Sequence, residues 1–255
     1  MTTPLKINLI SATVLGLTMA AGSVAHADTL FGVYAKADYW SANLDGEFGN
    51  GNSNGFFASR DDSSEREQHG ILSVQFEHFV PLVPNVWIRS NNIEYQGRSN
   101  LNSNVTVGNE SFDTSSPVNY LFDLSHTDIA LYYEILDNWI TLDVGLGAKS
   151  VNFDYQLRQG SSAYRFTESA TIPMLYGKAA FELPMSGWQV TAQGMALSFE
   201  DDRVEDVSVE LGYNFNDFMQ AAIGYRQIVI DVQASGVPES EMTLDGSYLS
   251  FILHI

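Results

Sequence analysis

The chain has 255 residues, no cysteine and a formal net charge of −19, with 31 acidic against 12 basic residues. The lack of cysteine excludes a disulfide framework and a thiolate metal site, and the acidic balance argues against a nucleic-acid partner. Aromatic residues make up 12% and charged residues 17% of the chain, which is too aromatic and too weakly charged for a disordered acidic protein.

The first 27 residues differ from the rest. Lys6 is the only charged side chain before Asp28, and the stretch that follows it is mostly apolar. The sequence AHA at 25–27 has small residues flanking one position, the pattern that signal peptidase cleaves. We therefore expect residues 1–27 to be a signal peptide and residues 28–255 to be the mature protein. The alternative is a transmembrane anchor, which needs about 20 apolar residues, and the apolar core here is shorter.

After this segment, apolar and polar residues alternate with a period of two, which predicts strands with one face against an apolar environment. In the stretch from Ile140 to Lys149, one face carries only apolar side chains, and the other carries Thr, Asp, two Gly and Lys. The pattern predicts ten strands, in chain order 30–41, 69–80, 86–98, 118–136, 139–156, 164–183, 187–200, 203–215, 218–232 and 243–255.

The connections between these strands alternate in length. Short ones lie at 80–85, 137–138, 183–187 and 214–217, and mostly longer ones lie between them. The two longest are 42–68 and 99–117, and within the first the stretch 42–57 is rich in Gly and Asn and predicts a flexible loop. A shorter connection of this set is predicted at 157–163. Tight periplasmic turns and longer external loops are typical of outer-membrane barrels. The prediction is an all-β fold, a closed antiparallel transmembrane β-barrel of about ten strands, with eight strands as the alternative.

A water-soluble β-sandwich is the competing interpretation, because each of its sheets also has one wet face. Strands in globular proteins cluster near five or six residues, whereas several of the runs here are about twice that length. Aromatic residues also lie near strand ends, as in the girdles at the two lipid–water boundaries of a membrane barrel. These features favour the barrel.

The two ends of the mature chain add a resemblance. The last strand, YLSFILHI, alternates as the end strands of outer-membrane barrels do, although it ends in Ile255 rather than in an aromatic residue. The opening DTLFGVYAKADYW, followed by GEFG, resembles a poorly characterised family of Gram-negative outer-membrane β-barrel proteins. The resemblance implies a location in the bacterial outer membrane, contact with its lipid and lipopolysaccharide, and assembly through the C-terminal strand by the barrel assembly machinery. It implies no activity.

In such a barrel the polar face of each strand lines the lumen. The strand phase predicts an inward network of Lys36, Asp38, Glu77, Asp128, Glu134, Asp143, Lys149 and Glu210. Two further runs, 86–98 and 164–183, change phase, which we interpret as bulges. With that phase change, further inward residues are Arg89, Lys178, Glu182 and Arg226.

The predicted strand order also gives partners and packing inside the lumen. Counting from the turn at 137–138 places Lys149 near Asp128 or His126, and Asp143 near Lys178. Unpaired buried charges are costly, so these pairs are expected to form. Glycines at 145, 147, 212 and 224 are expected to make room for long inward neighbours such as Arg226 or Tyr34.

Three functions remain open at this point. Ten strands enclose a lumen close to the size that side chains fill, which favours a structural or surface-interaction protein with a closed lumen. The alternative is a narrow channel for small solutes. A rim-sited hydrolase is the third, from His126 and Asp128 on one face with Ser125 beside them, but Ser125 points to the opposite side. We expect no enzyme, no cofactor and no metal.

The remaining histidines and acidic runs do not predict a site. His69 and His78 lie near opposite ends of one predicted strand and His254 ends the chain, so they do not form a metal-ligand set. The acidic stretches 58–67 and 200–206 could hold divalent cations, but they lack the calcium-loop pattern. We interpret both stretches, Asp206 included, as solvated surface.

Overall fold

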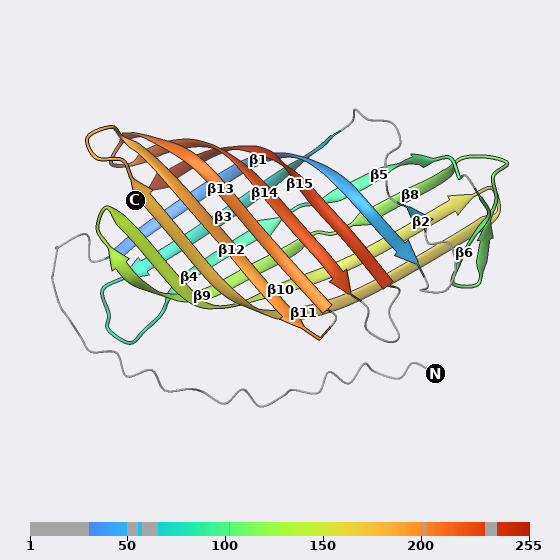
Figure 1. The fold of residues 1–255 in the computed structure, drawn as a ribbon, viewed down its shortest axis with the longest axis horizontal. Coiled ribbons are helices and arrows are strands. Elements are labelled where there is room, and N and C mark those ends of the chain that lie inside the picture. Colours follow the sequence, from blue (N-terminus) through green and yellow to red (C-terminus); the bar gives the residue numbers. More distant parts are fainter. Residues whose placement is uncertain (1–30, 50–55, 58–65, 102, 201, 233–238) are drawn as a thin grey trace. The chain divides into compact units, whose positions relative to one another are not determined.

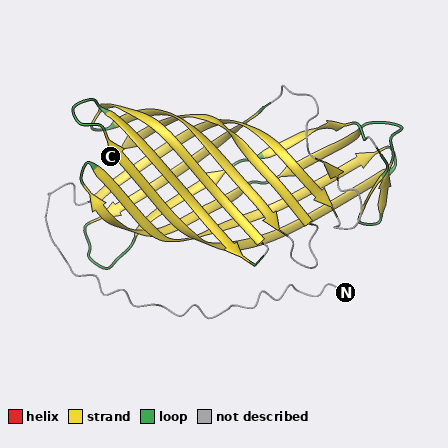
Figure 2. Cartoon of the chain, viewed as in Figure 1, coloured by secondary structure: helices red, strands yellow, loops and turns green. Residues whose placement is uncertain are grey.

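The computed structural model describes residues 31–49, 56–57, 66–101, 103–200, 202–232 and 239–255. The predicted signal peptide, part of the first predicted loop and most of the acidic stretch 58–67 lie outside these residues. The described part forms one compact unit, Phe31–Ile255, and consists of strands and turns (Figure 2). In it, no helix is long and apolar enough to cross a membrane.

Ten antiparallel strands, two of them interrupted, form a closed barrel (Figure 1). The wall closes because β1 pairs with both β15 and β3, and β10 pairs with β11 as well as β9. A closed wall leaves no sheet edge within the membrane. The uninterrupted strands are β1 (Phe31–Gly49), β3 (Glu67–His78), β10 (Ile140–Gln159), β11 (Ser162–Glu182), β12 (Trp188–Phe199), β13 (Asp202–Asn216), β14 (Met219–Val232) and β15 (Glu239–His254). The interrupted strands are β4 (Asn85–Asn91) with β5 (Glu94–Ser99), and β8 (Val118–Asp123) with β9 (His126–Asp137).

The ten-strand prediction is therefore confirmed and the eight-strand alternative is wrong. The loop prediction for 42–57 is wrong at both of its ends, because β1 continues to Gly49 and β2 (Phe56–Phe57) pairs with it. The loop prediction for 157–163 is also wrong. There β10 and β11 pair up to Gln159 and Ser162, and a two-residue turn with Gly160 at φ 56° joins them. Positive φ is accessible to glycine at little cost.

The two ends of the barrel differ. One end carries the short turns between β3 and β4, β9 and β10, β11 and β12, and β13 and β14, together with Phe31 and Ile255 (Figure 1). The other end carries the hairpin of β6 (Val105–Val107) and β7 (Glu110–Phe112), and the tips of β10 and β11. In outer-membrane barrels the short turns are periplasmic, so we refer to the first end as periplasmic and to the second as external.

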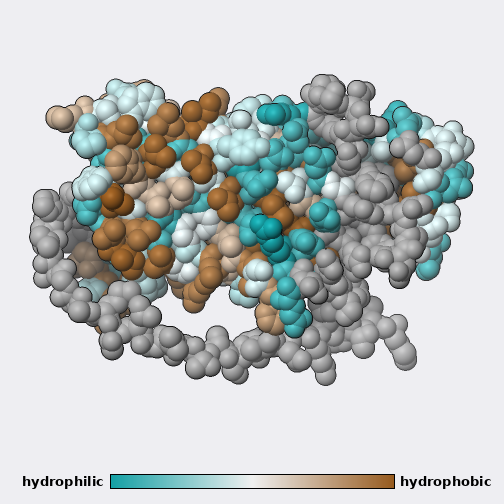
Figure 3. All heavy atoms as spheres, in the orientation of Figure 1, coloured by the Kyte–Doolittle hydropathy of each residue, from teal (hydrophilic) through white to brown (hydrophobic). Residues whose placement is uncertain are grey.

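An apolar belt surrounds the periplasmic part of the barrel. In Figure 3 the hydrophobic side chains gather over the left part of the visible face, and hydrophilic ones over the right. On β10 the outward side chains are apolar from Ile140 to Ala148, a height of roughly 20 Å for a strand tilted as in membrane barrels. Belt residues that are at least 40% exposed include Leu72, Val74, Ile88, Ile129, Leu131, Tyr133, Val144, Leu146, Leu175, Val190, Val207, Val209, Ile223, Leu249 and Phe251.

Beyond Ala148 the two faces of the wall exchange their character. On β10 the inward residues become Val151, Phe153, Tyr155 and Leu157, while the outward ones become polar. There Arg165 on β11 donates two hydrogen bonds to Asp154, at 3.0 and 2.7 Å, which lower the pKa of the Asp154 carboxyl. A polar outer face and an apolar interior are what a strand in water needs. The external part of the barrel therefore lies outside the lipid.

The external interior is a packed apolar core. Phe122 stacks on Tyr155 with ring centroids 4.5 Å apart, and Trp40 donates a hydrogen bond from its indole N–H to the Gly246 carbonyl at 3.0 Å. The hairpin β6–β7 contributes Val105, Val107 and Phe112. These side chains fill the outer half of the barrel, and the principal members of the core are Trp40, Leu44, Ile71, Ile93, Tyr95, Val105, Val107, Phe112, Val118, Phe122, Leu124, Tyr155, Leu157, Ile228, Met242, Leu244 and Tyr248.

Candidate functional site: the ion-paired lumen

Five charged side chains from five strands meet in the middle of the lumen, at the level where the apolar belt ends. They are Arg89 (β4), Asp128 (β9), Lys149 (β10), Asp206 (β13) and Arg226 (β14), and we call them the central cluster. Each is less than 10% exposed. Because each comes from a different strand, their contacts cross the interior and connect distant parts of the wall.

Asp206 is the most heavily bonded member. Arg226 donates to it from Nε at 2.8 Å and from a terminal nitrogen at 2.7 Å, and Lys149 donates at 3.0 Å. Arg89 adds a fourth donor at 2.5 Å. Charge-assisted bonds of this kind are the strongest hydrogen bonds in proteins, so Asp206 joins three strands through its one carboxylate.

Asp128 is the second anion of the central cluster. Lys149 donates to it at 2.7 Å and Arg89 donates through Nε at 2.9 Å. The amide of Asn91 donates to the same carboxylate at 3.0 Å, and its oxygen accepts a bond from Arg226 at 2.8 Å. The cluster thus contains three cations and two anions, and both carboxylates are fully used.

A second group, Lys36, Asp38 and Glu210, lies beside the central cluster and has a net negative charge, whereas the central cluster has a net positive one. Lys36 donates to Glu210 at 2.6 Å and lies 3.7 Å from Asp38. The Ser250 hydroxyl donates to Asp38 at 2.5 Å, and the Tyr248 hydroxyl donates to Glu210 at 2.9 Å. One cation and two anions here offset the excess cation of the central cluster, so the eight groups together are neutral.

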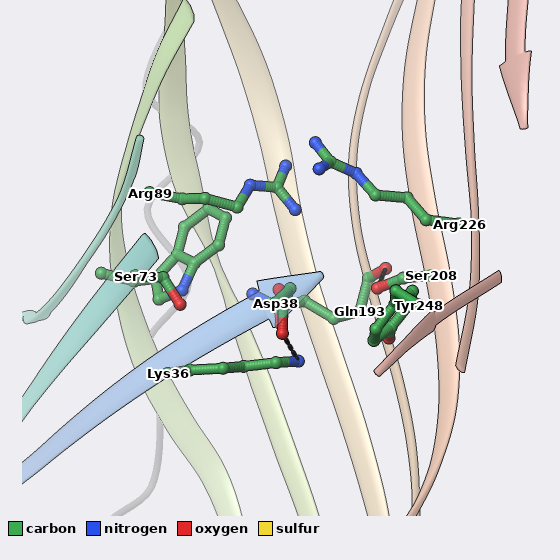
Figure 4. A pocket seen from close by; sticks show the side chains of 9 residues that line it. Lys36, Asp38, Ser73, Arg89, Gln193, Ser208, Arg226 and Tyr248 are labelled. Atoms are coloured by element: carbon green, nitrogen blue, oxygen red, sulfur yellow. Dashed lines mark hydrogen bonds and ion pairs between the residues drawn. The ribbon is translucent and has the colours of Figure 1, made fainter. Parts of the chain in front are cut away.

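A small cavity separates the two groups. Its volume is about 20 Å³, and it is lined by Lys36, Asp38, Arg89, Arg226 and Tyr248 among others (Figure 4). The figure shows the two guanidinium groups approaching each other from opposite walls, with Lys36 and Asp38 on one side of them. This volume holds about one water molecule, so side chains leave little space between the two groups.

The periplasmic part of the lumen is acidic and wetter. Lys178 lies 3.4 Å from Asp143, whose carboxylate is fully buried. Glu77 accepts hydrogen bonds from Gln75 at 2.5 Å and from the Tyr132 hydroxyl at 3.0 Å. Glu134 lies opposite Asp143 in the ladder and is exposed. Water therefore reaches this end of the lumen but meets the central cluster above it.

The two ion pairs that the strand order predicts are present. Lys149 pairs with Asp128, with which it is also level in the β9–β10 ladder, and Asp143 pairs with Lys178. Lys36, Asp38 and Glu210 form one group, and Arg89 and Arg226 join the cluster. Glu77 and Glu134 line the periplasmic end of the lumen, and Glu182 is exposed there.

One residue was assigned wrongly. Asp206, interpreted from its acidic surroundings as solvated surface, is 2% exposed and central to the network. Asp206 and Glu210 both occupy even-numbered positions of β13, so they share one face of the strand. That shared face was the signal that could have placed Asp206 inside. Glu205 beside it does face outward, where it accepts a bond from Arg203 at 2.5 Å.

The lumen glycines accommodate different neighbours from those expected. A Cβ atom at Gly224 would lie 2.4 Å from the Tyr248 ring, and one at Gly147 would lie 2.4 Å from the end of Met195. The expectation that these glycines make room for long inward neighbours therefore holds at 147 and 224, but the neighbours are Met195 and Tyr248 and not the named examples Arg226 or Tyr34.

The residues considered for catalysis or metal binding are engaged in structural contacts. His126 donates its Nδ1–H to the Leu124 carbonyl, 2.7 Å away, whereas the Ser125 hydroxyl donates to the Asn92 side-chain oxygen and accepts a bond from the Ile93 amide. Ser125 and His126 therefore do not form a nucleophile and base pair. His126, Asp128 and Asp206 are close enough to share a metal ion, but the two carboxylates already bind three cationic side chains.

No protein-family model matches the chain, and no curated protein matches it significantly. Solved structures similar to it include Ail, the attachment invasion locus protein of Yersinia pestis, at 9% identity and TM-score 0.38, covering 89% of this chain and all of that one. The outer membrane protease OmpT of Escherichia coli has 8% identity and TM-score 0.38, covering 88% and 92%. The CymD monoaromatic hydrocarbon channel has 8% identity and TM-score 0.32, covering 88% of each chain.

The similar structures are bacterial outer-membrane β-barrels with different roles. The closed wall of ten strands and the apolar belt around its periplasmic part are the features that decide its class. The chain is a transmembrane β-barrel of the bacterial outer-membrane type.

Proposed function

We propose that this protein is a non-conducting outer-membrane barrel with a structural or surface-interaction role. The observation that supports the proposal is the filling of the lumen in two successive layers. The central cluster crosses the lumen at the end of the belt, and the apolar core fills the barrel beyond it. An ion crossing the barrel would have to break the ion pairs and then pass through an apolar interior, where unpaired charge is very costly.

The part of the barrel beyond the lipid supports the second half of the proposal. Strands β10 and β11 are 20 and 21 residues long, about twice what a bilayer requires of a strand. The extra length forms a rigid structure with its own core and a polar outer face. Such a structure holds external surface away from the membrane, which suits contact with lipopolysaccharide or with other molecules outside the cell.

A narrow channel is the second candidate. The polar cavity beside Lys36 and the water-accessible end at Glu134 favour it. Planar-bilayer conductance of the refolded mature protein separates the two functions. A closed lumen gives no steps above the lipid baseline, and steady single-channel steps at neutral pH would contradict the proposal and support the channel.

Three proposals on biogenesis accompany this function. The precursor is cleaved before Asp28, which amino-terminal sequencing of the mature protein tests. The barrel assembly machinery recognises the C-terminal strand β15, which closes the wall by pairing with β1. Lipid and lipopolysaccharide contact the belt and the outer face beyond it. Recovery of uncleaved Met1 or of a soluble periplasmic pool would contradict the proposed maturation.

A further inference from the structure

Two periplasmic turns share an unusual construction. Each is a four-residue turn with proline second and a bulky apolar residue third. In Val80–Val83 the third residue is Leu82, with φ 67°, and in Leu183–Ser186 it is Met185, with φ 58°. The last residue donates its N–H to the carbonyl of the first, at 3.4 Å in the former turn and 3.2 Å in the latter.

Leucine and methionine are poor residues for this position. A turn with positive φ at its third residue favours glycine or asparagine, because a Cβ atom is strained there. Leu82 is 92% and Met185 105% exposed, so neither side chain packs within the described chain to offset that strain. An observed strain of this kind points to a function for the residue.

The register of the wall places the first of these turns at the level of the lipid. Strand β4 begins at Asn85, level with Tyr132 of β9, while β9 continues toward the periplasm with apolar outward side chains. Among these, Tyr133 donates its hydroxyl to the Leu82 carbonyl at 3.0 Å. Tyr133 faces outward in the belt. The turn that it binds therefore lies against the outer surface of the belt, at its periplasmic edge.

Aromatic side chains extend the apolar belt toward both turns. Phe31 stacks on Phe76 and meets Phe79 edge-on, with ring centroids 5.9 Å apart in each pair. On the other side Phe181 packs against Trp139 at 5.4 Å and is followed along the chain by Leu183. Neither turn contains a charged residue, whereas the turn after β13 contains Asp217 and β9 itself ends in Asp137.

We propose that Leu82 and Met185 are membrane anchors, inserted into the phospholipid of the periplasmic leaflet at the boundary of head groups and acyl chains. Burial of each side chain in lipid compensates for the strained backbone that presents it. The two anchors lie on different sides of the barrel, after β3 and after β11, so together they fix its depth and tilt. The inference is independent of whether the lumen conducts.

The lack of cysteine in the chain allows a direct test. Leu82→Cys and Met185→Cys are each labelled with a nitroxide in the full-length mature protein, in vesicles of phosphatidylethanolamine and phosphatidylglycerol. Collision rates with oxygen, which concentrates in lipid, and with a water-soluble nickel chelate then report the depth of each label. Leu146→Cys in the belt and Asp217→Cys in a polar turn are the matched controls.

We expect the labels at 82 and 185 to collide with the nickel chelate at least threefold less often than the label at 217, and with oxygen nearly as often as the label at 146. Heat-modifiable gel migration verifies that each variant is folded. Leu82→Asn and Met185→Asn, labelled at the neighbouring Val83→Cys and Ser186→Cys, should return these turns to water, since asparagine tolerates the backbone but not the lipid. Labels at 82 and 185 as accessible to nickel as that at 217 would overturn the proposal and leave a periplasmic protein as the partner of this surface.

Discussion

Replacing Asp206 by asparagine tests whether the central cluster holds the barrel together. The substitution keeps the shape of the side chain but removes one of the two anions that neutralise Arg89, Lys149 and Arg226. Asp206 receives four donors within 3.0 Å, and the new amide group would point its own N–H atoms at some of them. Breaking a buried ion pair in this way costs about 3–5 kcal/mol of folding free energy.

Glu205→Gln is the matched control, because it lies one residue away on the same strand and faces outward. Its partner Arg203 is 52% exposed in its side chain, and exposed pairs contribute only about 0–1 kcal/mol. Urea unfolding of both variants in the same vesicles, followed by tryptophan fluorescence and gel migration, gives the two free energies. Equal losses for Asp206→Asn and Glu205→Gln would refute the view that the cluster is a buried structural network.

Two further substitutions test the two halves of the barrel. Phe122→Ala removes a fully buried ring from the external core and should cost about 3–5 kcal/mol in urea unfolding, as truncations of buried aromatic residues do; a loss below about 1 kcal/mol would mean that this core is loosely packed. Val144→Arg puts a charge on the lipid face of β10 and should cost about 2–4 kcal/mol in vesicles, whereas Asn152→Arg, farther along the same face, should cost little. Equal costs at 144 and 152 would contradict the lipid boundary drawn between them.

Much of the wall could be predicted from the sequence because the period of two fixes which residues share a face. Lys149 and Asp128 were expected as neighbours from a simple count along two antiparallel strands. The count survives a register shift between Leu142 and Asp143, where β9 contains one extra residue, Ile135. The shift changes only the pairing below it, and the β10–β11 ladder that brings Lys178 to Asp143 has none.

The contacts across the lumen were beyond such counting. Arg89 and Asp206 are 117 residues apart and bond across the interior. The period of two shows that a side chain points inward, but the stagger of the strands around the barrel decides which inward side chains are level. Local composition was actively misleading for Asp206, because the acidic stretch around it resembles a solvated loop.

Along the long strands, the apolar residues change from one face of the strand to the other. On β11 the apolar residues occupy odd positions near the periplasmic end, as at Leu175 and Phe181, and even positions near the external end, as at Tyr164 and Phe166. The sequence interpretation of this change as a bulge is wrong, since the β10–β11 ladder runs from Ile140 and Phe181 to Gln159 and Ser162 without a shift.

What changes along these strands is therefore the environment. In the membrane the apolar residues must face outward to lipid, and beyond it they must face inward, away from water. β10 makes the same exchange after Ala148, and the central cluster lies where the two regimes meet. An alternation whose apolar phase inverts while its ladder stays in register marks the height at which a barrel wall leaves the bilayer, and it requires that the interior beyond that height be an apolar core.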